Sequence, residues 1–312
     1  EDEIAAMTVW DVVRPAYPDS RRDVLQTMLN DDGLGRVEAI FEGKDGQEIA
    51  VEGQVTTRFE DGLPVAAQGI FRDITERRQL DKMKQEFIST VSHELRTPLT
   101  SIIASLGLLA SGRLASQPER YEELISVAHR NSTRLLGLIN NLLDLQKLAA
   151  RKMSFRSDPV DVRGLLDEAV RGIRAFAEQS QVELVLEPIP NGLELLGDRD
   201  RLMQVLNNLV SNAIKFSPRG EEVVVGAYSR RNRVVIKVAD RGPGIPDEFR
   251  SRLFDQFTQA DPSKTRSSGG SGLGLSIAKG LVEGMRGHID LDTRIDEGTT
   301  FYVDLPAAER VH

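Results

Sequence analysis

Residues 202–216 read LMQVLNNLVSNAIKF, a stretch that combines an apolar pattern with a polar one. The apolar residues recur at steps of four and three, the period of a helix that buries one face; they are Leu202, Leu206, Leu209, Ala213 and Phe216. Gln204, Asn208, Asn212 and Lys215 share a second face. Carboxamide oxygens can ligate Mg²⁺, and a lysine supplies a positive charge for phosphate. This face either binds an anionic ligand with its metal or is turned to solvent.

A second polar segment is 238–246, VADRGPGIP, which follows a strand-like run. A carboxylate at the end of a strand, here Asp240, can accept a hydrogen bond from an exocyclic amine such as that of adenine. Gly242 and Gly244 have no Cβ atom, so the backbone can turn sharply beside a flat base. Taken alone, a loop with two glycines is usually only a turn.

Glycines cluster in 269–275, GGSGLGL, and an apolar helical pattern follows. Backbone amides at a helix N-terminus bind phosphate well, and glycines let the backbone approach it closely. Lys264 and Arg266 lie just upstream, on an expected lid. A Walker-type loop is excluded because its glycine–lysine–serine/threonine ending is missing. A glycine-rich linker is the alternative interpretation of this segment.

Residues 87–99, FISTVSHELRTPL, indicate a different chemistry. A neutral imidazole nitrogen, as in His93, is a competent nucleophile for phosphorus, and an unperturbed histidine with a pKa of ~6.5 is mostly neutral at neutral pH. Glu94 can take the other ring proton, which raises nucleophilicity. Thr97 lies on the same helical face as His93. Pro98 removes a helical N–H and crowds the carbonyl of Glu94, so we hypothesise a hinge there that couples a signal to catalysis.

Most single histidines on helices are structural or lie at the surface, and His129, His288 and His312 are assigned to that class. His93 is assigned to catalysis because charged residues, a threonine and a proline accompany it, and because a nucleotide-binding pattern follows it.

The 312-residue chain has a net charge of −8 and no cysteine, and its length suits two or three domains. An acidic chain has no general nucleic-acid footprint, so no nucleic-acid partner is expected. Disulfides, thiol nucleophiles and iron–sulfur ligation are excluded. No apolar run approaches the roughly 20 residues of a membrane-spanning helix. The absence of cysteine fits a reducing compartment, so we expect a cytoplasmic portion, which could follow a membrane anchor upstream.

Three parts follow from the periodicity, and together they predict a multidomain α+β fold. Residues 1–75 read as a small α/β module, with a helix at 24–29 followed by a three-stranded antiparallel meander. Residues 76–150 have one narrow apolar stripe in each of two helical stretches, which predicts a helical hairpin that dimerises into a four-helix bundle. The stripe of the second helix is Leu124, Ala128, Leu135, Leu138, Leu142 and Leu145, with Asn131 in its interior. Residues 155–308 mix strands and helices in an α/β domain.

In order and spacing, five segments resemble the successive boxes of the histidine-kinase ATP-binding domain, whose superfamily includes gyrase-type and chaperone-type ATPases. They are 208–218, 240–245, 253–257, 270–275 and 298–301. The resemblance implies an α/β sandwich that holds ATP under a flexible lid. It implies that Asn212 binds Mg²⁺, that Asp240 contacts adenine, and that Phe254 and Phe257 anchor the lid. The implied ATP-binding residues are Asn208, Asn212, Lys215, Asp240, Gly242, Gly244, Phe254, Phe257, Lys264, Arg266, Gly270, Gly272, Leu273 and Gly274.

Residues 87–99 closely resemble the acceptor box of the same kinases. This implies a homodimeric histidine kinase that phosphorylates its own His93 and passes the phosphoryl group to an aspartate of a response regulator. In that family the position of Thr97 orients a water that dephosphorylates the regulator. Residues 1–75 resemble the second half of a PAS domain; a dimerising spacer is the alternative.

Two other classes of protein compete with this interpretation. An ATPase of the same superfamily that drives a conformational clamp would explain 200–301, but not the acceptor segment or the hairpin. A non-catalytic scaffold conflicts with the intact His93, Asn212 and Asp240.

Overall fold

The computed structural model describes residues 13–14, 35–43, 45–61, 63–111, 117–255 and 272–308. The chain divides into two compact units, Glu1–Ser89 and Thr90–His312. The helix expected at 24–29 lies outside the described residues.

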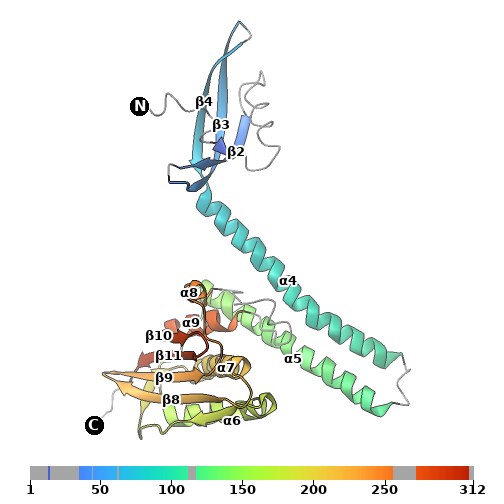
Figure 1. Cartoon of the computed structure of the whole chain (residues 1–312), viewed down its shortest axis with the longest axis vertical. Helices are drawn as coiled ribbons and strands as arrows, with labels where there is room; N and C mark the ends of the chain where they lie inside the picture. Colours follow the sequence, from blue (N-terminus) through green and yellow to red (C-terminus); the bar gives the residue numbers. More distant parts are fainter. Residues whose placement is uncertain are drawn as a thin grey trace. The chain divides into compact units, whose positions relative to one another are not determined.

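The first unit contains an antiparallel sheet in the order β1-β2-β3-β4 (Figure 1). Its strands are β1 (Val13–Arg14), β2 (Gly35–Glu42), β3 (Glu48–Glu60) and β4 (Leu63–Asp73). The expected meander is confirmed, because β3 pairs with both β2 and β4. Alternate residues of one face are buried, namely Ala39, Val51 and Val55. Phe41 and Phe71 pack edge to face at 4.8 Å on this side.

Two long helices follow, α4 (Thr75–Ala110) and α5 (Pro118–Ala149), as the sequence predicts. α4 begins in the first unit and continues through the buried Pro98 without interruption. The two helices are joined by a hydrogen bond from Asn131 Nδ2 to Ser101 Oγ, at 3.2 Å. Asn131 therefore lies in the interior position that its place in the apolar stripe predicts. Within the described part of the chain, no helix is long and apolar enough to cross a bilayer.

The apolar stripe of α5 packs against two different surfaces. Ala128 and Leu138 are buried, as expected of a hairpin seam. Leu142 and Leu145 pack instead against the core of the α/β domain, together with Leu148. The expectation that the whole stripe forms one seam is therefore wrong for its C-terminal part, because the α/β domain follows directly and covers that part.

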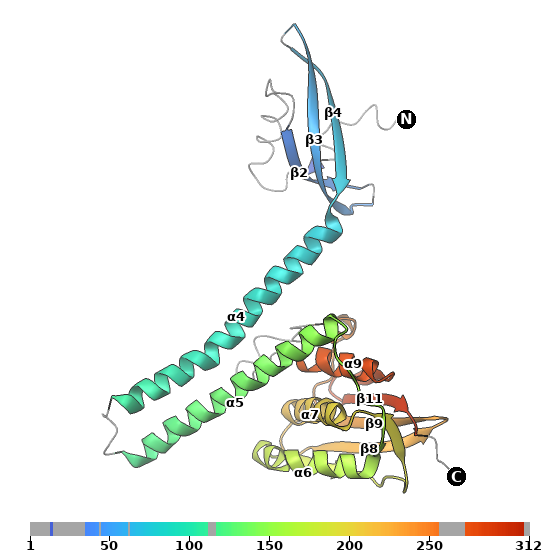
Figure 2. The same ribbon diagram turned by 180° about the vertical axis from the view of Figure 1, so that it is seen from behind.

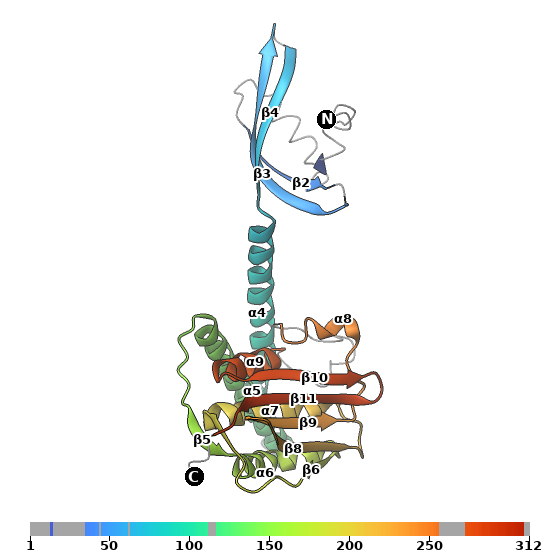
Figure 3. The ribbon, with the colours of Figure 1, turned by 90° about the vertical axis from the view of Figure 1, so that its left-hand side faces the viewer.

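The rest of the second unit is an α/β domain. Its strands are β5 (Asp158–Asp161), β6 (Glu183–Leu186), β7 (Glu194–Gly197), β8 (Glu222–Arg230), β9 (Arg233–Asp240), β10 (His288–Arg294) and β11 (Gly298–Pro306). Its helices are α6 (Val162–Ser180), α7 (Arg199–Phe216), α8 (Asp247–Arg250) and α9 (Gly274–Gly284). The main sheet has the order β10-β11-β9-β8-β6, and β5 pairs with β7. Figures 2 and 3 show α6, α7 and α9 on one face of the main sheet.

The layers are held by one apolar core between sheet and helices, which contains Leu165, Leu206, Ile236 and Leu281 among many others. Both α6 and α7 begin at a capping aspartate. The Asp161 side chain accepts from the backbone N–H of Gly164, and the Asp198 side chain caps α7. The predicted hairpin of β8 and β9 around 231–232 is confirmed. This architecture confirms the α/β sandwich. It holds in place α7, the end of β9 and the start of α9, which carry predicted site residues.

Candidate nucleotide-binding and phospho-acceptor site

The polar face of α7 meets the N-terminus of α9. Asn208 Nδ2 donates a hydrogen bond to the carbonyl oxygen of Gly274, at 3.2 Å. Leu273, just before α9, is almost completely buried and anchors the start of that helix. Gly272 has φ +67°, a conformation that favours glycine. Two segments separated by more than sixty residues thus come together where backbone amides of a helix N-terminus can bind phosphate.

Asp240 ends β9 in a half-buried position. Its Oδ1 accepts hydrogen bonds from the backbone N–H groups of Gly242 (2.8 Å) and Thr299 (3.2 Å). Burial raises the pKa of Asp240, and these two hydrogen bonds oppose the rise. Within the described residues, both hydrogen bonds engage Oδ1, which leaves Oδ2 to accept from a ligand amine. The sequence pattern predicts no role for Thr299, although 298–301 carries part of the family resemblance.

The loop after Asp240 is held tightly from two sides. Gly244 has φ +72°, and a Cβ atom there would collide with the carbonyl oxygen of Arg294. A Cβ atom on Gly242 would lie 3.0 Å from the carbonyl oxygen of Phe216, at the end of α7. The two predicted glycines therefore let the loop approach both α7 and the β10–β11 hairpin.

Lys215 is half-buried in the last turn of α7, and its Nζ lies 4.9 Å from the centroid of the Phe216 ring. Burial lowers the pKa of Lys215, and the positive charge of Arg134 on α5 lowers it further. Asn212, one turn earlier, is also half-buried. A phosphate at this face would supply the negative charge that Lys215 needs.

The donor set at this face fits Mg²⁺ only with help from a ligand. The described residues contain no group of three or more His, Cys, Asp or Glu residues that could hold a metal ion. Mg²⁺ usually takes few protein ligands and completes its shell with water and phosphate oxygens. The amide of Asn212 beside a bound triphosphate is compatible with that preference.

Gln204 differs from the other members of the predicted polar face. Its Nε2 donates to Asp144 of α5 at 2.8 Å, and Arg201 Nη1 contacts the same carboxylate at 3.3 Å. The expectation that Gln204 shares the ligand-binding role is not supported, because its amide joins α7 to α5.

Of the predicted lid residues, Phe254 is described and packs against the domain core, with Lys279 Nζ 5.4 Å from its ring centroid. Phe257, Lys264, Arg266 and Gly270 lie outside the described residues.

The acceptor segment lies on α4. His93 is exposed, and Thr97 Oγ1 donates to its backbone carbonyl oxygen at 3.2 Å. Glu94 Oε2 accepts a hydrogen bond from Arg134 Nη2 of α5, at 3.3 Å. Sequence reasoning missed Arg134, because its partner across the hairpin depends on the register of the two helices.

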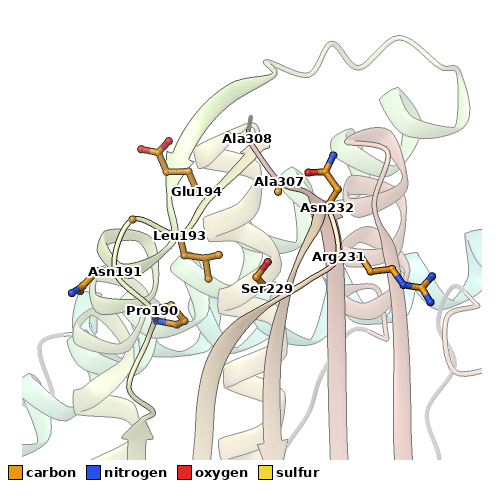
Figure 4. Close-up of a pocket in the computed structure, with 10 residues that line it drawn as sticks. Pro190, Asn191, Leu193, Glu194, Ser229, Arg231, Asn232, Ala307 and Ala308 are labelled. Carbon is orange, nitrogen blue, oxygen red and sulfur yellow. The ribbon is translucent and has the colours of Figure 1, made fainter. Parts of the chain in front are cut away.

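A cavity of about 500 Å³ opens at the other end of the main sheet, around the β8–β9 hairpin (Figure 4). Asn191, Leu193, Ser229, Asn232 and Ala307 are among its lining residues. β9 runs from Arg233, next to this hairpin, to Asp240. The cavity is therefore separate from the site formed by α7, Asp240 and α9.

Two family models match the chain. Residues 83–151 match the His Kinase A (phospho-acceptor) domain, and residues 197–309 match the histidine kinase-, DNA gyrase B- and HSP90-like ATPase. The first match contains His93 and the second contains the site on α7, β9 and α9.

Relatives and solved structures agree with these matches. The sensor-like histidine kinase SenX3 of Mycolicibacterium smegmatis is 33% identical over 85% of this chain and 67% of its own length. The circadian input-output histidine kinase CikA of Synechococcus elongatus is 32% identical over 91% of this chain, but the chain spans only 37% of CikA. A crystal structure of full-length ShkA in complex with AMPPNP has a TM-score of 0.54 and 31% identity, covering 73% of this chain and 47% of ShkA.

The fold, the site and the relatives indicate the same family. The phospho-acceptor hairpin precedes the α/β ATPase-type domain, which is the order that the sequence predicts. This chain belongs to the sensor histidine kinases.

Proposed function

We propose that the protein binds ATP with Mg²⁺ and transfers the γ-phosphoryl group to His93. The proposal rests chiefly on one observation: an exposed His93 and the cluster around Asp240 belong to the same compact unit. The family matches support the pairing of these two sites in one chain.

Each part of the proposed ATP site has a separate task. Asp240 would bind the adenine amine through Oδ2, and α7 would carry the ligands of phosphate and Mg²⁺. The start of α9 would bind phosphate, and the residues near 254–266 would close over it. The proposed ATP-binding residues are Asn208, Asn212, Lys215, Asp240, Gly242, Gly244, Phe254, Phe257, Lys264, Arg266, Gly270, Gly272, Leu273 and Gly274, with Asn212 as the metal ligand.

The acceptor residues carry the transfer. His93 attacks as the neutral imidazole, and Glu94 accepts the proton from its other ring nitrogen. ATP and Mg²⁺ supply the phosphoryl group and neutralise its charge. We further propose that phospho-His93 passes the group to an aspartate of a response regulator. Thr97 would then orient the water for a phosphatase reaction on that regulator.

We propose three domains and a homodimer. A partial PAS-like sensor domain would span 1–75, the dimerisation and phosphotransfer hairpin 76–150, and the ATP-binding domain 155–308. The meander of β2, β3 and β4 supports the first, and exposed apolar side chains on α4 and α5 support dimerisation.

The test uses γ-labelled ATP with Mg²⁺. Acid-labile, base-stable label on the protein is expected for the wild type and for His129→Gln, since His129 is an exposed histidine outside the acceptor segment. No label is expected for His93→Gln. ATP turnover without protein label would favour a clamp ATPase, and absence of nucleotide binding would favour a scaffold.

A further inference from the structure

Arg134 of α5 lies opposite the acceptor segment of α4. Its Nη2 contacts Glu94 Oε2 at 3.3 Å, with side chains 41% and 23% exposed, respectively. Less than one turn away, Asn131 Nδ2 donates to Ser101 Oγ at 3.2 Å. Two polar contacts between the helices therefore place Arg134 at the level of His93.

The charge of Arg134 also acts on the end of α7. Its positive charge contributes to the lowered pKa of Lys215, so the last turn of α7 lies within electrostatic range of this arginine. α7 is held to α5 at its other end by Asp144, which binds Gln204 and Arg201 and whose side chain is only 13% exposed. Arg134 thus contacts the carboxylate next to His93, and its charge acts on Lys215.

The Glu94 carboxylate needs a defined orientation to act on His93. Residues i and i+1 of a helix point in different directions, so Glu94 reaches the His93 ring only in a restricted set of rotamers. A guanidinium holds a carboxylate in a more defined geometry than an ammonium does, because its donors form a rigid planar fork.

We propose that Arg134 is a positioning residue for autophosphorylation, which holds the Glu94 carboxylate within reach of His93. The inference rests on the proposed roles of His93 and Glu94. In the step, the His93 nitrogen lone pair forms the N–P bond, while the bond between the γ-phosphorus and its bridging oxygen breaks and its electron pair leaves with ADP. The proton of the other ring nitrogen passes to Glu94.

The test compares Arg134→Gln and Arg134→Lys with Arg130→Gln, a control at an exposed arginine one turn earlier on α5. Each variant of the 312-residue chain is assayed for the rate of labelling at saturating ATP, for KM of ATP and for thermal midpoint. We expect Arg134→Gln to lower the rate of labelling about tenfold, which is less than the roughly 10²–10⁴-fold rate enhancement that a general base supplies. We expect KM to stay within about twofold and Arg134→Lys to recover much of the rate, because an ammonium can still bind a carboxylate.

A double-mutant cycle with Glu94→Gln separates positioning from a structural role. If Arg134 acts through Glu94, then Arg134→Gln costs little further rate in the Glu94→Gln background. A labelling rate for Arg134→Gln equal to or above that of Arg130→Gln overturns the proposal. So does an equal loss in both backgrounds, or a raised KM with an unchanged rate. Label that persists in His93→Gln refutes the proposed acceptor as well, whereas His93-dependent label with an unaffected Arg134→Gln refutes only the role of Arg134.

Discussion

Asp240 is a half-buried carboxylate whose pKa is changed by the fold. Burial raises its pKa although two backbone N–H groups bind its Oδ1. Because the folded-state pKa lies above the unfolded value, the charged carboxylate destabilises the fold at pH values above the folded-state pKa. This destabilisation disappears as the pH falls through that pKa. The fold therefore keeps a carboxylate here at the expense of stability near neutral pH, as expected of a ligand-binding group.

Asp240→Asn separates binding from stability. Asparagine can keep Oδ1 as the acceptor for Gly242 and Thr299, but it presents an NH₂ group where Oδ2 would meet the adenine amine. We expect calorimetry to show ATP affinity weakened by about 2 kcal/mol, and the thermal midpoint at neutral pH to be equal or higher. Unchanged affinity together with a lower midpoint would contradict the assigned role.

Gly244→Ala tests how tightly the loop after β9 is held. Alanine there has an unfavourable positive φ and would collide with the Arg294 carbonyl oxygen. Gly220→Ala is the matched control, because Gly220 also has a positive φ (+85°) but lies next to open space. In chemical denaturation, we expect Gly220→Ala to cost about 1 kcal/mol and Gly244→Ala clearly more, with weaker nucleotide binding only in the latter. Equal costs would show that the loop can move away.

At the scale of elements, periodicity predicts helices and strands well but does not identify their partners. The four-and-three pattern at 202–216 predicts α7, and alternation predicts β8 and β9. The same pattern cannot tell that Leu142 and Leu145 contact the α/β core rather than α4, or that Gln204 binds Asp144. These depend on how α5 and α7 pack, which involves residues about sixty positions apart. The hinge at Pro98 stays a prediction, since α4 is continuous there.

Asp144→Ala tests the contact that joins α5 to α7. Removing the carboxylate leaves Arg201 and Gln204 without their shared acceptor, a loss of about 1.5 kcal/mol for hydrogen bonds to a partly buried charge. Hydrogen exchange at 141–149 should accelerate roughly tenfold. Asn140→Ala, at an exposed position of the same helix, is the control. Identical exchange in both variants would show that the apolar contacts of Leu145 and Leu148 suffice.

At the scale of the whole molecule, the order of segments carried the strongest information. Each glycine-rich or polar segment is ambiguous alone, but their sequence along the chain identifies the family, and the fold brings Asn208 and Gly274 into contact. Large apolar side chains on the hairpin remain exposed in a single chain, among them Ile103 (62%) and Leu136 (59%). Such a surface needs a partner, and a second hairpin would complete a four-helix bundle.

Ile103→Glu places a charge on this surface and should abolish the homodimer. We expect sedimentation to give a monomer mass at concentrations where the wild type and Arg130→Gln are dimers, because burying an unpaired carboxylate costs several kcal/mol. A variant that stays dimeric would show that Ile103 lies outside the dimer interface.

The central claim is that the phosphoryl group of ATP ends on one imidazole, that of His93. Its most direct test is mass-spectrometric mapping of phosphopeptides, under alkaline conditions, after incubation of the whole chain with ATP and Mg²⁺. We predict phosphate on His93 of the wild type. We predict none on the Asp240→Asn variant when the ATP concentration is well below that variant's dissociation constant for ATP. Phosphate on another residue, or ATP consumption that leaves His93 unmodified, would contradict it.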